Sequence, residues 1–182
     1  GLGFAMSGFP YWTTDIGGFF RPKDQYTSEA YHELLIRWFE YGTFCPIFRI
    51  HGYQTETEMW KFGPQVEKIL HEYDNLRNRL MPYIYSAAWS VTSQGATMMR
   101  ALPLQYPNDP KVVDIGDEFL FGPSLLINPV TKPGATNRAV YLPAGTTCFN
   151  LWTGKQNKGG ETIEPSAPID KIPIFAKAGT IL

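Results

Sequence analysis

Three side chains suited to binding or acid–base chemistry occur at corresponding places in two segments near the N-terminus. Asp15 follows the aromatic and β-branched run 10–14, and Arg49 and His51 lie near the end of the apolar run 44–52. Aromatic and β-branched residues favour strands, and residues two apart on a strand point to the same side. The pattern therefore predicts a carboxylate, a guanidinium and an imidazole at the carboxyl ends of two strands.

Aromatic residues and glycines surround Asp15. Trp12 precedes it, and Gly17, Gly18 and Phe19 follow it. Glycines allow a sharp turn or a close approach to a ligand, and ligands bind at strand carboxyl ends in α/β folds. The plain alternatives are an aspartate that caps a turn and an Arg-X-His pair with a structural role. Flat aromatic walls beside a fixed carboxylate favour a sugar-binding site instead.

The elements that would bring these side chains together form a strand–helix–strand unit over residues 10–52. Thr27 or Ser28 supplies a helix N-cap, apolar residues recur at three and four positions through Tyr41, and Gly42 ends the helix. This order is typical of parallel sheets, in which neighbouring strands end at the same edge. We therefore expect the aspartate to lie beside the Arg-X-His pair.

The rest of the N-terminal half predicts helices, apart from residues 1–9, which read as a loop. Pro64 begins a helix after a glycine, and Pro82 either kinks the following helical stretch or marks a boundary in it. Arg77 and Arg79 are predicted to lie on a solvated face or in ion pairs.

The character of the sequence changes beyond Gly95. Short runs rich in β-forming residues alternate with Gly/Pro turns, which predicts an antiparallel β-sandwich. The runs are 119–130 with two short strands, 138–142, 148–152, 161–164 and 172–175. The predicted fold class is therefore α/β over residues 1–95, followed by an all-β part over residues 96–182.

Composition and charge exclude several classes of function. The 182 residues carry 16 basic and 17 acidic side chains, a net charge of −1, and have no basic run that would bind nucleic acid. No apolar run reaches transmembrane length. The two cysteines and three histidines lack the spacing of a disulfide framework or a metal site, so neither a metal nor a cofactor is predicted. No compartment is predicted.

Four sequence blocks occur in a recognisable order. They are residues 7–19 (SGFPYWTTDIGGF), 44–52 (FCPIFRIHG), 119–130 (FLFGPSLLINPV), and 141–145 (YLPAG) together with 151–154 (LWTG). These blocks resemble glycoside hydrolase family 31, the α-glucosidases and α-xylosidases, over nearly the whole chain. The resemblance implies a retaining α-glycoside hydrolase with a (β/α)8 TIM barrel followed by β-sandwich domains.

The resemblance also implies roles for individual residues. Asp15 and His51 resemble residues that hydrogen-bond the sugar in the −1 subsite. Arg49 resembles the partner that holds the carboxylates of that site, and Trp12 and Phe19 resemble its aromatic wall. The implied substrate is an oligosaccharide with a terminal α-linked xylose or glucose.

Both catalytic carboxylates of the family are expected outside this chain. Retaining hydrolysis uses a nucleophile and an acid/base roughly 5 to 5.5 Å apart. The family's nucleophile motif, Trp-X-Asp-X-Asn-Glu, does not occur here, and the acid/base is expected a little before residue 1. We therefore expect about the last three barrel strands with their helices in residues 1–95 and an incomplete proximal sandwich in residues 96–182. Such a chain would be inactive without the remainder of its polypeptide or a complementary chain.

Three other functions are consistent with the same residues. One is a non-catalytic carbohydrate-binding module that retains the sugar contacts, and another is a structural fragment. The third is a transglycosylase of the same family, because a sugar hydroxyl can release a covalent glycosyl intermediate in place of water.

Overall fold

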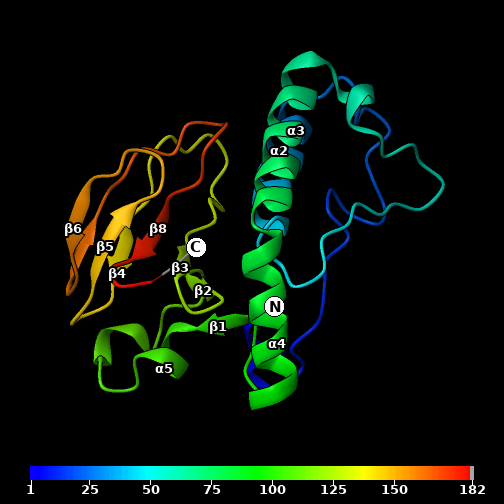
Figure 1. Cartoon of the computed structure of the whole chain (residues 1–182). Coiled ribbons are helices and arrows are strands. Elements are labelled where there is room, and N and C mark those ends of the chain that lie inside the picture. Colours follow the sequence, from blue (N-terminus) through cyan, green and yellow to red (C-terminus); the bar gives the residue numbers. More distant parts are fainter. Residues whose placement is uncertain (181–182) are drawn as a thin grey trace.

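The computed structural model describes residues 1–180. Helices α3 and α4 run end to end with α2 beside α3, and the strands lie to one side of them (Figure 1). The helices are α1 (Leu2–Met6), α2 (Glu29–Gly42), α3 (Pro64–Arg79), α4 (Met81–Gln94) and α5 (Leu102–Gln105), with short 3-10 turns η1 (Met59–Phe62) and η2 (Pro110–Val112). No helix in the described part of the chain is long and apolar enough to cross a membrane.

The helix ends follow the local signals in the sequence. The Ser28 side chain accepts a hydrogen bond from the backbone N–H of Tyr31, so it is the N-cap of α2. Leu80 separates α3 from α4, and Pro82 is the second residue of α4, so it marks a boundary. Gly95 ends α4 in the left-handed conformation, with φ of 66°.

The prediction of two regular strands, one before Asp15 and one around Arg49 and His51, is wrong. Segments 12–19 and 47–53 do run side by side in parallel, but only Ile16 and Ile50 form a β-bridge. Pro46 has no N–H to donate, and the residues before it continue α2 in turns, with the Cys45 N–H bonded to the Gly42 carbonyl. The backbone therefore becomes extended too late for a full strand.

Two further N-terminal expectations also need correction. Residues 1–9 are not only a loop, because α1 forms there, lies against β1 (Met99–Ala101) and has one buried residue, Ala5. Arg77 is buried on α3, whereas Arg79 is exposed as predicted.

The C-terminal part holds two antiparallel sheets. The further strands are β2 (Phe119–Phe121), β3 (Leu125–Ile127), β4 (Val140–Leu142), β5 (Thr147–Asn150), β6 (Gln156–Lys158), β7 (Glu161–Ile163) and β8 (Ile174–Lys177). One sheet has the order β1-β2-β3-β8-β5-β6, and the other pairs β4 with β7. Strand β6 was not predicted, because its residues are polar.

The larger sheet is covered on both faces. On β2, Phe119 and Phe121 join the core formed with the helices, while Leu120 between them joins the core shared with the second sheet. On β3, Leu126 likewise points away from its two neighbours in sequence. Side chains alternate along a strand, so a strand buried on both faces reads as continuously apolar.

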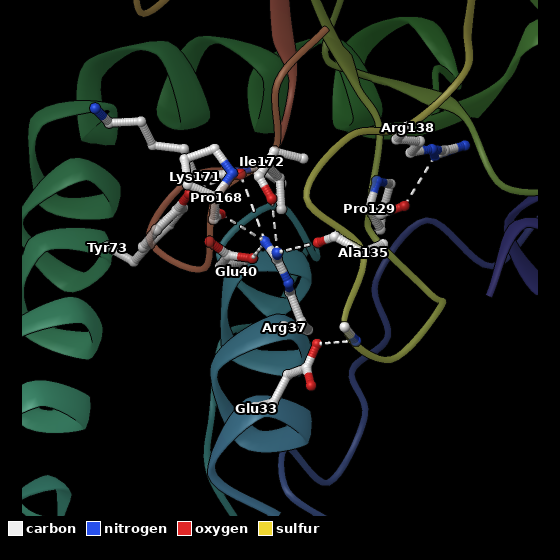
Figure 2. A network of polar contacts seen from close by, with 12 residues as sticks. Glu33, Arg37, Glu40, Tyr73, Pro129, Ala135, Arg138, Pro168, Lys171 and Ile172 are labelled. Carbon is white, nitrogen blue, oxygen red and sulfur yellow. Dashed lines mark hydrogen bonds and ion pairs between the residues drawn. The ribbon is translucent and has the colours of Figure 1, made fainter. Parts of the chain in front are cut away.

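A buried arginine ties the helices to the sheets (Figure 2). Arg37 of α2 pairs with Glu40 at 3.1 Å. Its guanidinium also donates to the carbonyls of Ala135, Ala167 and Pro168 at 3.1, 2.8 and 3.0 Å. These carbonyls belong to two loops of the C-terminal part, so the two halves of the chain are held at a fixed orientation.

The buried carboxyl group of Glu118, just before β2, generates a pH prediction. Burial raises its pKa from 4.5 to about 7, although it accepts a hydrogen bond from the Tyr141 N–H at 3.0 Å. The folded protein therefore retains this proton more strongly than the unfolded chain, and the associated stability is lost as pH rises from about 4.5 to about 7. Glu118→Gln carries no titrating group. Its melting temperature should rise relative to wild type across this pH range.

Asp114→Asn is the matched control for this comparison. Asp114 is exposed and lies four residues before Glu118, so the melting temperature of Asp114→Asn should stay close to that of wild type. A constant difference between wild type and Glu118→Gln between pH 4.5 and 7 would contradict the prediction.

Candidate functional site

Asp15 and Arg49 come together from the two parallel segments and form a salt bridge. The Ile47 N–H donates to the Trp12 carbonyl at 3.1 Å, and the Tyr53 N–H donates to the Phe19 carbonyl at 2.7 Å, which sets the register of the segments. The predicted pairing of the two segment ends is confirmed. Both side chains remain partly exposed, 30% for the carboxylate and 48% for the guanidinium.

The same two segments also carry a cluster of aromatic rings, a few residues further along the chain from Asp15 and Arg49. The Phe19 ring is centred 5.3 Å from the His51 ring and 5.7 Å from the Tyr53 ring. Phe20 packs edge-on against both Phe19 and Tyr53. The predicted site residues Phe19 and His51 therefore form one partly exposed surface.

Trp12 lies differently. In the described residues its ring pairs with Tyr41 of α2, 6.4 Å away, and not with Phe19 or His51. Its indole N–H is buried without a hydrogen-bond partner among residues 1–180. The structure thus brings four of the five predicted residues into two contacting pairs and places the fifth against α2.

The turn after Asp15 uses the two predicted glycines and is held by two side chains, Arg21 and Tyr31, that carry no functional signal in the sequence. Gly17 and Gly18 have φ of 85° and 91°, which favours glycine. Arg21 donates to the carbonyls of Ile16 at 2.8 Å and of Gly18 at 3.1 Å, and the Tyr31 hydroxyl donates to that of Gly17 at 2.9 Å. Arg21 lies in a polar loop. Nothing in the sequence pattern of such a loop indicates that its arginine will donate to carbonyls a few residues earlier in the chain.

Helix α2 supports the aspartate segment from behind. The indole N–H of Trp38 donates to the Thr14 hydroxyl at 2.8 Å. Ile16 is buried against the last turn of α2, where a methyl group on Gly42 would lie 2.4 Å from the Ile16 Cδ1 atom. The segment that bears Asp15 is therefore fixed between a hydrogen bond and a tight apolar contact.

The chemistry of the site is that of polar recognition. Among the five predicted residues, the single carboxylate is Asp15, so no pair of carboxyl groups for acid–base work forms there. A carboxylate paired on one side with a guanidinium keeps lone pairs that accept hydrogen bonds from hydroxyl groups. No cluster of three or more metal-ligating side chains occurs among residues 1–180.

Two hollows lie near these segments. The larger, about 450 Å³, lies between α2 and residues 129–133 and contains none of the five predicted residues. The smaller, about 350 Å³, is lined by Arg49 together with Phe48, Trp60 and Asp74. The smaller hollow reaches the predicted site through Arg49, although Asp15, Phe19 and His51 do not line it.

Comparison with known families matches both halves of the chain. Residues 1–87 match the glycosyl hydrolases family 31 TIM-barrel domain, and residues 95–182 match the glycosyl hydrolase family 31 C-terminal domain. The chain belongs to glycoside hydrolase family 31. The predicted resemblance is confirmed, as is the order of a barrel-type part followed by a part with antiparallel sheets.

Family 31 relatives of different specificity align with the whole chain. It is 42% identical to an alpha-xylosidase of Saccharolobus solfataricus, 38% to an isomaltosyltransferase of Sporosarcina globispora and 34% to alpha-glucosidase 2 of Bacillus thermoamyloliquefaciens. Each alignment covers 100% of this chain, but only 25%, 17% and 22% of the relative. The chain thus spans about a quarter or less of the length of these relatives.

Solved family 31 structures share the arrangement described above. The alpha-xylosidase of Xanthomonas citri superposes with a TM-score of 0.94 at 44% identity, over 100% of this chain and 21% of that one. A soil-metagenome alpha-xylosidase complexed with xylose superposes with a TM-score of 0.93 at 34% identity, over 99% and 29% respectively.

The contact between Gly42 and Ile16 can be tested by a double-mutant cycle. Gly42→Ala should cost about 1–3 kcal/mol of unfolding free energy, because the added methyl overpacks against the Ile16 Cδ1 atom. Ile16→Val removes that atom, so the double variant should be more stable than the sum of the single changes predicts. Chemical denaturation of the four proteins measures the coupling.

Gly3→Ala in α1 is the control, since a methyl group there meets nothing within 4 Å and should leave stability unchanged or slightly raised. Strict additivity of Gly42→Ala and Ile16→Val would refute the proposed packing.

Proposed function

We propose that the protein that carries this chain is a retaining α-glycoside hydrolase that releases terminal α-linked xylose or glucose from oligosaccharides. The observation that carries this proposal is that the same two parallel segments bear the Asp15–Arg49 ion pair and the Phe19–His51 ring contact, in a chain of family 31. A fixed carboxylate, an imidazole and an aromatic face are the groups that recognise a sugar's hydroxyls and its apolar face.

In this proposal the five residues bind the sugar in the −1 subsite. Asp15 and His51 hydrogen-bond its hydroxyl groups, and Arg49 holds Asp15 in place. Phe19 and Trp12 supply the aromatic wall, with Trp12 backed by Tyr41. None of the five is the nucleophile or the acid/base in this proposal, because retaining hydrolysis needs two carboxyl groups and the family resemblance assigns both to segments that precede the block around Asp15.

We assign the nucleophile and the acid/base to segments outside this chain. Residues 1–95 would supply about the last three strands and helices of the (β/α)8 barrel, and residues 96–182 the proximal β-sandwich. The breaks between the two family matches, at residues 87 and 95, support this division. The chain would act only with the remainder of its polypeptide or with a complementary chain.

Xylose is the favoured terminal sugar. Relatives named alpha-xylosidase include one at 42% identity and a solved structure at 44%. Transfer to another sugar is the second candidate, because the relative at 38% identity is an isomaltosyltransferase. Product analysis separates the two, since transfer yields longer oligosaccharides and hydrolysis yields the free monosaccharide.

Asp15→Asn in the full-length protein tests the proposed site. The variant loses the charge that pairs with Arg49 and weakens the hydrogen bonds to substrate hydroxyls, each worth about 1.5–3 kcal/mol when a charged group is involved. We expect kcat/KM on aryl α-xylosides and α-glucosides to fall about a hundredfold or more. Release of glucose but not xylose by the wild type would overturn the preference for xylose.

The control is Asp24→Asn, which alters an exposed aspartate in the loop that follows and should leave kcat/KM unchanged. If Asp15→Asn left both kcat and KM at wild-type values, the sugar-binding role would be wrong and a structural role would replace it.

A further inference from the structure

Arg77 is a buried cation that makes its contacts with backbone oxygens. It lies near the end of α3 and donates to the carbonyls of Thr43 at 2.7 Å, Cys45 at 2.8 Å and Pro46 at 3.0 Å. No carboxylate pairs with it among residues 1–180. Its contacts are therefore with the loop that leaves α2.

Aromatic rings hold the Arg77 guanidinium in one place. It lies 5.8 Å from the centre of the Phe48 ring and 5.5 Å from that of Phe121 on β2. Phe44 packs edge-on against Phe121, 5.8 Å away. The cation thus joins the loop, the helix and the larger sheet.

A charge buried in this way needs a reason. Transfer of a guanidinium from water is costly, and burial lowers the pKa of Arg77 to about 10. An apolar residue would fill the same position on the buried stripe of α3, which continues through Leu70 and Tyr73 at helical spacing. What an apolar residue could not supply is a planar set of donors for several carbonyls.

Those carbonyls lie directly before the proposed site. Pro46 lies three residues before Arg49. The next residue, Ile47, donates its N–H to the Trp12 carbonyl. Pro46 has no N–H, so this part of the loop lacks one of the backbone bonds that would otherwise fix it. The guanidinium supplies fixed donors where the backbone lacks them.

We propose that Arg77 is a positioning residue, which fixes the loop 43–46 so that Arg49 meets Asp15 in the correct place. The inference rests on the proposed function of the Asp15–Arg49 pair. Arg77 acts on that pair through the Thr43, Cys45 and Pro46 carbonyls and does not touch the sugar. Displacement of a binding group by about 1 Å can cost up to a hundredfold in rate.

The test uses Arg77→Lys in the full-length protein. Lysine keeps the charge but cannot reproduce the planar set of donors. We expect kcat/KM on an aryl α-xyloside to fall about ten- to a hundredfold, with the protein still folded by circular dichroism. Arg79→Lys, two residues away on the exposed face of α3, is the matched control and should retain wild-type kcat/KM. Wild-type kcat/KM for Arg77→Lys would overturn the proposal.

A double-mutant cycle with Arg49→Met separates positioning from general structural support. If Arg77 acts through Arg49, the lysine substitution at 77 should change kcat/KM less than twofold once Arg49 has been removed. Losses that multiply in the double variant would show that Arg77 does not act through Arg49. The proposed function fails separately, if Arg49→Met alone leaves kcat/KM unchanged.

Discussion

Backbone carbonyls inside this protein need donors wherever the chain leaves regular structure, and arginines supply many of them. Arg21 serves the turn after Asp15, Arg77 serves the loop before Arg49, and Arg37 serves two loops of the C-terminal part. Leaving a buried carbonyl without a hydrogen-bond donor costs about 1–3 kcal/mol of folding free energy. Each of these arginines donates to two or more carbonyls. One guanidinium reaches several oxygens because its donors lie in a plane and point outward, which no other side chain offers. The two segments that meet at the candidate site share one β-bridge and a few backbone hydrogen bonds, so the arginine contacts on either side of them add much of their support.

The same kind of contact joins the two halves of the chain. Helices cover one face of the six-stranded sheet, and their shared core includes Leu35 and Leu70 as well as Phe119 and Ile174. Apolar burial does not fix an orientation by itself, but hydrogen bonds do. Arg37 donates to carbonyls of the loops at Ala135 and Pro168, and these bonds fix the rotation of α2 against the loops. Helix α2 then carries that orientation to the site through Trp38 and Gly42. A change at the boundary between the halves would therefore reach the Asp15 segment through one rigid element.

Local signals in the sequence were sufficient for the long helices α2, α3 and α4, whereas the short helices α1 and α5 were missed. The strand–helix–strand order was sufficient for the pairing of Asp15 with Arg49. Caps and proline positions act within one turn, so the end of α4 at Gly95 and the start of α2 at Thr27 or Ser28 could be predicted without tertiary information, and the structure identifies Ser28 as the cap. The regular strands predicted around the site failed because strand formation depends on neighbours distant in sequence, and β6 was missed because its polar residues show no apolar pattern. Arg77 was misassigned although its position lies on the apolar stripe of α3. A charged residue on such a stripe indicates a buried contact. The prediction for Arg77 followed its residue type, which is usually exposed, and not its position on the stripe.

The distribution of the arginines separates support from recognition. Arg37 and Arg77 are buried and donate mainly to carbonyls, whose dipoles attract a cation but carry no net charge. Arg49 is exposed and pairs with a carboxylate, so the ion pair at the site is compensated within itself. Such a pair in contact with water contributes little to stability, typically about 0–1 kcal/mol. A hydrogen-bond donor that displaced water from Asp15 would lower the local dielectric and so strengthen the hydrogen bond that this carboxylate accepts. In the proposed function, the buried arginines hold the backbone around the site before the sugar binds, and the exposed Arg49 leaves Asp15 accessible to the sugar.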